Sequence, residues 1–460
     1  METGSSSIKR HGSARPRGCR RGRGALIGAW LCVVVAWAVG PDAGAQTTEA
    51  YELPPINYST SAPHDALTRV RAQIAAGELK LAGSDREVVR QLLAALHVPV
   101  ASQMLVFSKT SFQNHLIGPG HPRCLFYTDD CYVGWVPGGL MEIAAIDPGL
   151  GPVFYSFDPR GLSARHPPEF ARDSDCLRCH GGMFVRGIPS VFARSLYADG
   201  EGEPIFRQGS EVVDDRTPFS ERWGGWYVTG LHGATVHRGN VLAAEAGEKL
   251  VFDPARGANI TNLARFFDAS AYLTGGSDIA ALLVFEHQTT MQNALTRASL
   301  ECRHILEYQA GLQAVLKPAP EADPDGLMLD SVRSVFDHSA DAVVDALLFK
   351  NEAALPKTIV GAPAFPPAFA AGVPRARDGS SLKDLLLSEH LFRSRCSYLI
   401  YSDSFRLLPA ALKHRVFARL SRALAPAQPS SRYAYLGAAE RQRIAAILRE
   451  TLPDFPAGKS

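Results

Sequence analysis

The hydrophobic pattern of this chain changes near residue 260, and this change limits the folds that the sequence can adopt. Between residues 103 and 233, short aromatic or β-branched runs are separated by Gly, Pro and Asp, as is typical of strands and turns. After residue 260, apolar residues recur at spacings of three and four, which indicates helices. We therefore predict an α+β fold, with a strand-rich central region followed by a helical C-terminal region.

The same patterns predict the individual elements. The runs expected to form strands are 103–112, 123–128, 131–136, 141–147, 152–158, 190–199, 203–209 and 225–233. The segments expected to form helices are 66–79, 85–98, 279–311, 328–350, 381–398, 407–424 and 438–451. Ser277 is the expected N-cap of the long helix that begins at Ile279. The chain divides into a leader (1–45), a mixed β-rich region with N-terminal helices (46–258) and a helical region (259–460).

Residues 1–45 have the layout of a secretory signal peptide. Seven basic residues and no acidic ones lie between residues 9 and 23, and the apolar run ALIGAWLCVVVAWAVG (25–40) follows. Ala43-Gly44-Ala45 then offers a small-residue cleavage site. The apolar run is about 16 residues long, shorter than the roughly 20 that a membrane span needs. We expect export to the periplasm and no stable membrane span after cleavage, with an uncleaved anchor as the alternative.

The charge balance does not favour a nucleic-acid partner. The leader holds seven of the 48 basic residues and two of the 46 acidic ones, which leaves 41 basic and 44 acidic residues in the mature chain. The slight basicity of the full chain therefore belongs to the export signal. The weakly acidic mature chain therefore gives no indication of nucleic-acid binding.

The stretch SDCLRCHGG (174–182) carries the most specific chemical signal in the sequence. The composition of the chain predicts roughly 0.004 chance occurrences of C-x-x-C-H. A structural zinc site needs four ligands, commonly in two pairs, and the chain has no second C-x-x-C or H-x3-H pair. A thioredoxin-like motif would lie between a strand and a helix, whereas this one follows the polar run ARDSD. A plain disulfide remains the simplest alternative.

Covalent haem attachment explains all three motif residues together. Cys176 and Cys179 would form thioethers to the two haem vinyl groups, and His180 would be the axial ligand of the iron. Such attachment takes place after export, which agrees with the leader. We therefore expect one covalently bound haem c.

With CLRCH and an export signal, the chain resembles the cytochrome c superfamily. The stretches LVFSKTS, DCYVGWVPGG, ERWGGWYVTGLHG, CSYLIYS and AAERQRIAAILRETLP are also similar to a group of uncharacterised bacterial exported proteins with a single haem c motif. The similarity to that group covers most of the mature chain and implies haem binding but no substrate. Small cytochromes c need only about a hundred residues, so most of this chain must serve another purpose.

The sixth iron ligand is not fixed by the motif. His232 and His237 follow it by 52 and 57 residues, beside the aromatic residues of WGGWY, and are the first candidates. His287 is another, on an expected helix face shared with Met291. Each of these histidines could instead be a core or turn residue. Met183 is too close to His180 to reach the opposite side of the iron.

An open sixth position would permit catalysis. Glu221, Arg222, Tyr227 and His232 are then candidates for acid–base or polarising roles, although ordinary structural roles are the simpler reading. The sequence thus supports a periplasmic monohaem protein that passes single electrons to an unknown redox partner. The alternatives are a peroxidase-like oxidoreductase and a haem-based sensor or binding module.

Four further cysteines of the mature chain lie outside the motif. Cys124 and Cys131 could face each other across a hairpin and form a disulfide in an oxidising compartment. Cys302 and Cys396 lie on expected helices and could either pair or stay as buried thiols.

Overall fold

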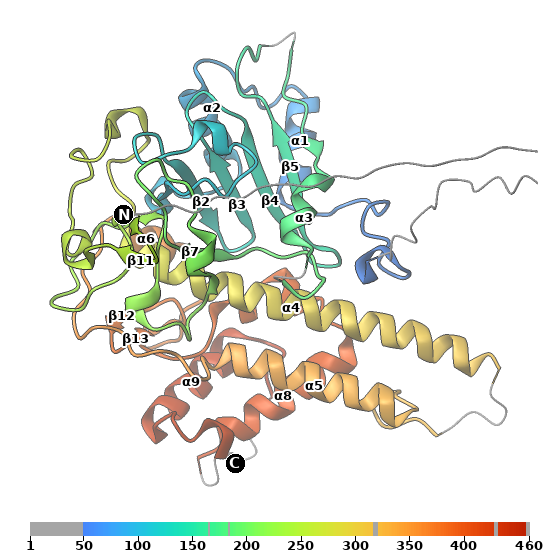
Figure 1. The fold of residues 1–460 in the computed structure, drawn as a ribbon. Helices are drawn as coiled ribbons and strands as arrows, with labels where there is room; N and C mark the ends of the chain where they lie inside the picture. The colour runs from blue at the N-terminus through green and yellow to red at the C-terminus, as the bar shows by residue number, and fades with distance from the viewer. Residues whose placement is uncertain (1–48, 164–165, 183–184, 316–320, 427–430, 457–460) are drawn as a thin grey trace, which may run out of the picture. The chain divides into compact units, whose positions relative to one another are not determined.

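The computed structural model describes residues 49–163, 166–182, 185–315, 321–426 and 431–456. The expected leader and Met183 lie outside these ranges. Within them the α+β prediction is confirmed, since a strand-rich sheet region is followed along the chain by helices (Figure 1).

An antiparallel seven-stranded sheet with the strand order β6-β5-β4-β3-β2-β1-β9 forms the strand-rich part. Its strands are β1 (Met104–Val106), β2 (Arg123–Thr128), β3 (Cys131–Trp135), β4 (Met141–Asp147), β5 (Gly151–Phe157), β6 (Ala171–Arg172) and β9 (Trp226–Tyr227). Two-stranded sheets pair β7 (Ala193–Leu196) with β8 (Ser210–Val213), β10 (Ala244–Ala246) with β11 (Lys249–Val251), and β12 (Leu385–Ser388) with β13 (His390–Phe392).

The helices begin and end close to the expected positions, with one exception given below. They are α1 (Ala66–Ala75), α2 (Asp85–Ala95), α3 (Leu177–His180), α4 (Ile279–Gln313), α5 (Asp330–Leu347), α6 (Phe365–Phe369), α7 (Asp403–Arg406), α8 (Ala410–Ala423) and α9 (Ala438–Thr451). Local capping explains two of the starts. Asp65 accepts a hydrogen bond from the Thr68 amide before α1, and Ser84 forms a capping box with Glu87 at α2.

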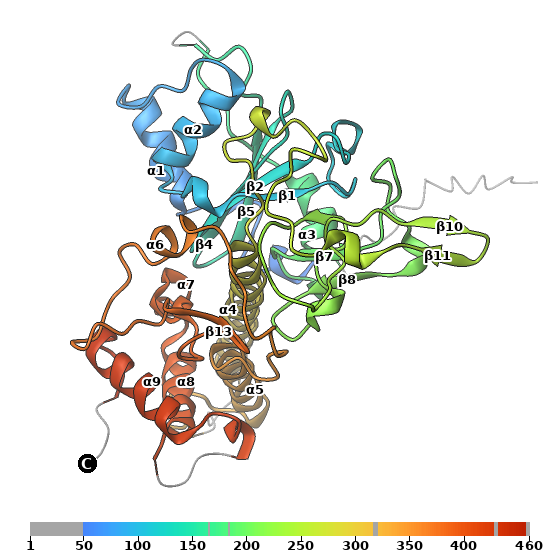
Figure 2. The same cartoon turned by 90° about the vertical axis from the view of Figure 1, so that its left-hand side faces the viewer.

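The two faces of the sheet have different partners because side chains alternate along each strand. Phe126 and Val133 belong to the same buried hydrophobic cluster as Val88 and other residues of α1 and α2, and these helices cover this face in Figure 2. Leu125 and Gly134, their neighbours in sequence, point to the opposite face and line a cavity. The alternation of β2 and β3 therefore separates a packed face from a face that borders the candidate site.

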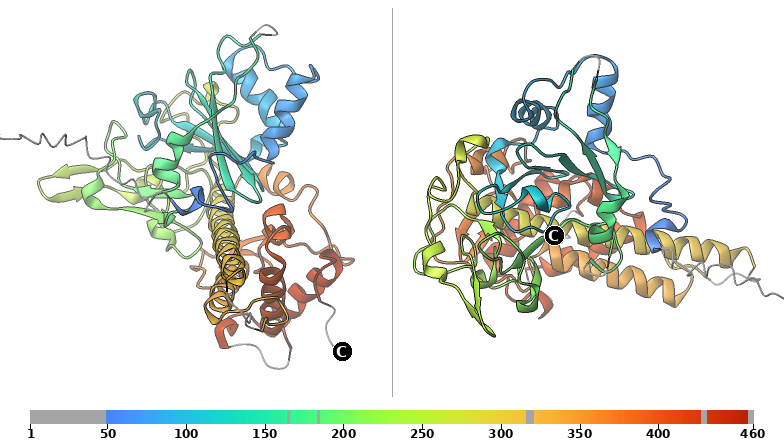
Figure 3. Two further views of the ribbon diagram at one scale, coloured as in Figure 1. Left: turned by 90° about the vertical axis from the view of Figure 1, so that its right-hand side faces the viewer. Right: turned by 45° about the horizontal axis from the view of Figure 1, so that its top comes forward.

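Helix α4 lies between the sheet and the C-terminal helices (Figures 1 and 3). Its first three turns are buried on nearly all sides. Asp278, not Ser277, is its N-cap, since the Asp278 carboxylate accepts from Ala281 N at 3.2 Å. Ser277 instead donates to Tyr227 O at 2.6 Å and accepts from Leu105 N at 3.0 Å. The expected capping residue therefore ties the start of α4 to strands β1 and β9.

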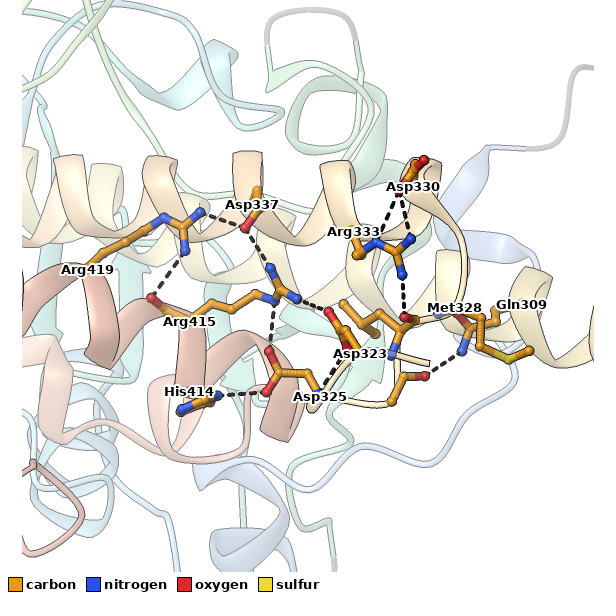
Figure 4. Close-up of polar contacts among 12 residues, drawn as sticks. Gln309, Asp323, Asp325, Met328, Asp330, Arg333, Asp337, His414, Arg415 and Arg419 are labelled. Atoms are coloured by element: carbon orange, nitrogen blue, oxygen red, sulfur yellow. Dashed lines mark hydrogen bonds and ion pairs between the residues drawn. The ribbon is translucent and has the colours of Figure 1, made fainter. Parts of the chain in front are cut away.

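Ion pairs hold α8 against α5 and the turn that precedes it (Figure 4). Asp337 of α5 accepts from Arg415 at 2.8 Å and from Arg419 at 2.7 Å, both on α8. Asp325 Oδ2 lies 3.0 Å from Arg415 Nε as an ion pair, and Asp325 Oδ1 lies 2.7 Å from His414 Nδ1. Most of these side chains are only partly exposed, and their ion pairs hold α8 in place against α5.

The helix expected at 381–398 is wrong. Strands β12 and β13 form a hairpin there, followed by the 3-10 helix η10 (Tyr398–Tyr401). Leu387 and Glu389 have φ values of 53° and 61°, which an α-helix does not tolerate. The strand expected at 203–209 is also wrong, because this segment contains the 3-10 helix η6 (Phe206–Gln208) and the strand β8 follows it.

In the described part of the chain, the cysteines outside the motif are buried free thiols: Cys124, Cys131, Cys302 and Cys396. The hairpin of β2 and β3 forms as expected, but its register pairs Cys124 with Trp135 and Cys131 with Thr128. The two thiols are therefore several residues apart along the ladder, and the expected disulfide between them is not formed. Among the described helices, none is long and apolar enough to cross a membrane.

Candidate functional site

Cys176, Cys179 and His180 lie on one short helical segment. The 3-10 helix η4 (Ser174–Cys176) continues directly into α3, which Figure 1 shows in front of β4 and β5. Residues at i, i+3 and i+4 share one face of a helix, so the local conformation brings the three motif side chains to the same side.

Local contacts determine where this segment begins and ends. The Asp173 side chain accepts from Asp175 N at 3.0 Å and caps the first turn. At the other end, a Cβ on Gly181 would lie 2.8 Å from the Tyr51 hydroxyl and 3.1 Å from Leu177 O. A side chain at position 181 would collide with these two groups, so glycine is needed where the chain leaves the helix next to Tyr51.

The His180 imidazole is oriented by the backbone of Ser190. His180 Nδ1 lies 2.9 Å from Ser190 O, and a carbonyl can only accept, so Nδ1 carries the proton. Nε2 is then the nitrogen with a free lone pair. The ring contacts Phe154 and Phe192 at centroid distances of 4.9 and 4.8 Å. Burial lowers the pKa of His180 to about 4, which keeps the imidazole neutral at pH 7, as metal ligation requires.

A cavity of about 460 Å³ opens at the motif. This volume lies within the roughly 300–1,000 Å³ of cofactor and ligand pockets. Its wall is the sheet face opposite α1 and α2, together with the segment 191–194 and the start of α4. The lining includes Cys176, Cys179, His180, Val106, Leu125, Tyr132, Gly134, Ala144, Phe154, Val191, Phe192, Trp226 and Phe285. The exposed rings of Phe112 and Phe206 stand at its edge.

One ion pair lies within this mostly apolar wall. Arg123 of β2 pairs with Glu142 of β4, and both side chains are only about one-fifth exposed. Strand β3 runs between them with Gly134 at the crossing, where a Cβ would meet the Arg123 guanidinium. Because Gly134 has no side chain, the Arg123 guanidinium can cross β3 and reach the Glu142 carboxylate. Arg123 and Glu142 both act electrostatically on His180.

The Cys176 thiol is not prepared for redox chemistry of its own. Burial, followed by the negative charge of Asp173, raises its pKa to about 12. Catalytic and redox-active C-x-x-C thiols have a lowered pKa, because the thiolate is the nucleophile. Both motif cysteines are free thiols, so the plain disulfide is not formed either.

His232 and His237 lie away from the cavity, side by side in the core, with ring centroids 4.7 Å apart. His232 Nδ1 donates to Thr235 O at 2.7 Å and its Nε2 accepts from Asn259 N at 3.0 Å. His237 Nδ1 accepts from Gly239 N at 3.0 Å. Neither ring lines the cavity of the motif. Their expected role as the sixth ligand does not fit this arrangement.

His287 is also committed elsewhere. Its Nδ1 lies 3.3 Å from Asp215 Oδ2 and its Nε2 lies 2.8 Å from Ser397 Oγ, while its ring stacks on Phe349 at 3.8 Å. The order Asp-His-Ser matches that of a hydrolytic triad. A nucleophile must however reach its substrate, and His287 and Ser397 are completely buried. We interpret the hydrogen bonds from Asp215 through His287 to Ser397 as a buried network that joins α4 to η10.

The candidates for an acid–base role lie outside the cavity as well. Arg222 is buried and donates to Glu286 at 2.5 Å, and the Tyr227 hydroxyl donates to Pro119 O at 2.7 Å. Neither they nor Glu221 line the cavity. Of the two tryptophans of WGGWY, Trp226 lines the cavity, whereas Trp223 packs against His237.

The sequence did not lead us to expect that residues of the sheet line the cavity. The signal for this wall is the occurrence of Gly134 and of the charged residues Arg123 and Glu142 on strands that are otherwise mostly apolar. A face that carries small and charged residues in the middle of a sheet borders something other than a packed core.

In the described part of the chain, no group of three or more His, Cys, Asp or Glu side chains is arranged to hold a metal ion. Comparisons with protein-family models, with curated proteins and with solved structures found no match.

Proposed function

We propose that this protein binds one haem c covalently through Cys176 and Cys179, with His180 as an axial ligand of the iron. The observation that supports the proposal is the cavity: all three motif residues line the same space, and His180 Nδ1 is hydrogen-bonded to Ser190 O, so Nε2 carries the lone pair that a metal ligand needs. Bound haem would supply one-electron chemistry between the ferrous and ferric states.

The residues around the motif fit such a group. Phe154, Phe192, Trp226 and Leu125 give the cavity an apolar, largely aromatic lining of the kind that cofactor sites have. Arg123 and Glu142 place one partly buried ion pair in the wall, where its charges would act on the potential of a bound cofactor. His180 is held neutral and in the tautomer that a metal ligand needs.

Export belongs to the same proposal. The C-x-x-C-H motif needs attachment outside the cytoplasm, and residues 1–45 have the composition of an export signal. The protein would then work in the periplasm and exchange single electrons with a partner protein. Nothing in the charge of the mature chain points to a nucleic-acid partner.

A second function is favoured by the place of the three candidate ligands. His232, His237 and His287 are hydrogen-bonded in the core, away from the cavity. A small exogenous molecule at the sixth position would then be compatible with the site, as in a haem oxidoreductase or sensor. Ligand titration distinguishes the two functions: rapid cyanide binding to the ferric protein supports the second, and resistance to cyanide supports electron transfer.

The proposal is tested on the full chain expressed with a periplasmic haem c maturation system. We expect a c-type pyridine haemochrome spectrum that survives acid–acetone extraction. Cys176→Ser with Cys179→Ser should abolish covalent haem, and His180→Ala should keep it but change the coordination bands. Cys302→Ala, a buried thiol away from the cavity, is the matched control and should load normally. Absence of haem from the wild type, or haem that extracts completely, would contradict the proposal.

A further inference from the structure

The position of His180 depends on residue Ser190, ten residues further along the chain. Ser190 N and Ser190 Oγ both donate to His180 O, at 2.8 and 2.9 Å. The Ser190 carbonyl accepts in return from His180 Nδ1 at 2.9 Å. Three hydrogen bonds thus bind the backbone and the ring of His180 to one residue, and the orientation of the ring follows the placement of that residue.

Helix α4 places Ser190 through a side chain. Asn293 Oδ1 accepts from Val191 N at 3.1 Å, and Asn293 Nδ2 donates to Val191 O at 2.7 Å. One amide therefore satisfies both backbone groups of the residue after Ser190, as a paired strand would. One turn later, Arg297 donates to Val185 O at 2.8 Å. The polar edge of α4 thus holds both ends of the segment 185–191.

We propose that Asn293 is a positioning residue for the His180 imidazole, acting through Val191 and Ser190. The inference rests on the proposed function, and it goes further by assigning the helical part of the chain a role in setting the electronic properties of the iron ligand. An axial histidine whose Nδ1–H donates to a fixed carbonyl is a stronger electron donor, and loss of such outer contacts typically changes metal affinity or activity about 10–100-fold.

The test compares three variants of the full, haem-loaded chain. Asn293→Leu removes both hydrogen bonds to Val191, and Asn293→Asp keeps the acceptor and removes the donor. Gln292→Leu is the matched control: it removes a buried amide of the same helix that donates to Ser404 Oγ at 3.0 Å, away from the segment 185–191. The measurements are the midpoint potential and, in the haem-free chain, hydrogen exchange of the Val191 amide.

Asn293→Leu should shift the ferrous-to-ferric equilibrium toward ferrous by about tenfold, which is about 59 mV for one electron. Asn293→Asp should shift it less, and Gln292→Leu should leave it unchanged. The Val191 amide should exchange at least about tenfold faster in Asn293→Leu than in Gln292→Leu, because it loses its acceptor.

Two results would overturn the inference while leaving the proposed function intact: a haem-loaded Asn293→Leu variant with the wild-type potential, or an equal shift in Gln292→Leu, which would show general loosening of α4. A wild type without covalent haem would overturn both. If Asn293→Leu does not fold, the same comparison is made with Asn293→Asp.

Discussion

His237 offers a quantitative test of whether it is a core histidine or an iron ligand. Its side chain is almost fully buried, and its Nδ1 accepts from the Gly239 amide. Protonation of Nδ1 would place a second donor against that N–H, so the neutral ring is strongly favoured. Burial, together with the neighbouring His232, lowers the pKa of His237 to about 3.

The sign and the size of the effect on stability follow from this pKa. An unfolded histidine titrates near pH 6.5, so between pH 6.5 and 3 the unfolded chain binds a proton that the folded chain does not. The free energy of unfolding therefore falls as the pH drops below 6.5. At about 1.36 kcal/mol per pKa unit, His237 alone should cost about 3 kcal/mol of stability between pH 7 and pH 4.

The variant His237→Phe keeps an aromatic ring and removes the titration. It should be about 1–2 kcal/mol less stable than wild type at pH 7, because the Gly239 amide loses its acceptor. At pH 4 it should instead be the more stable protein, since it lacks the loss of about 3 kcal/mol. Urea unfolding at both pH values, followed by the fluorescence of the adjacent Trp223, measures the difference.

Titrating groups away from His237 contribute equally to both proteins and cancel in the comparison, whereas the neighbouring His232 is coupled to His237 and is part of the measured difference. Equal losses of stability in wild type and His237→Phe would refute the reasoning. A changed iron absorption spectrum in the haem-loaded variant would instead show that His237 reaches the cofactor, contrary to its position in the core.

Three further predictions concern stability and can be measured by urea unfolding. Gly134→Ala should lower the free energy of unfolding by about 1–3 kcal/mol and disturb the ion pair of Arg123 and Glu142, because the new methyl group meets the guanidinium. A variant as stable as wild type would contradict the position of Arg123 across Gly134. Ser277→Ala should cost about 2–4 kcal/mol, since it leaves a buried backbone donor and acceptor unpaired; a loss of under about 0.5 kcal/mol would speak against those bonds. Arg415→Met should cost about 1–2 kcal/mol, less in 1 M NaCl, and a salt-independent loss would point to packing instead of charge.

Much of the secondary structure was readable from the sequence, because local spacing determines which face of a helix or strand is apolar. The hairpin of 123–136 and the final helix α9 appear where the pattern placed them. The failures come from tertiary context. The segment 381–398 has apolar residues at helical spacing, but its side chains find their core partners as a hairpin, with positive φ at Leu387 and Glu389.

The candidate site divides in the same way. The sequence by itself determined that the three motif residues lie together, because Cys176, Cys179 and His180 are close enough in the chain for helical geometry to bring them to one side. It could not choose among His232, His237 and His287, since hydrogen bonds to residues such as Asn259, Asp215 and Ser397 keep those rings in the core.

Only the tertiary structure decided what surrounds the motif. The cavity wall is one face of a sheet whose strands are separate in sequence. Glycine is needed at position 134 because the Arg123 side chain of the neighbouring strand crosses there. The link from Asn293 to His180 likewise spans more than a hundred residues. Such contacts depend on how the elements pack, and packing is a property of the whole chain that no local pattern encodes.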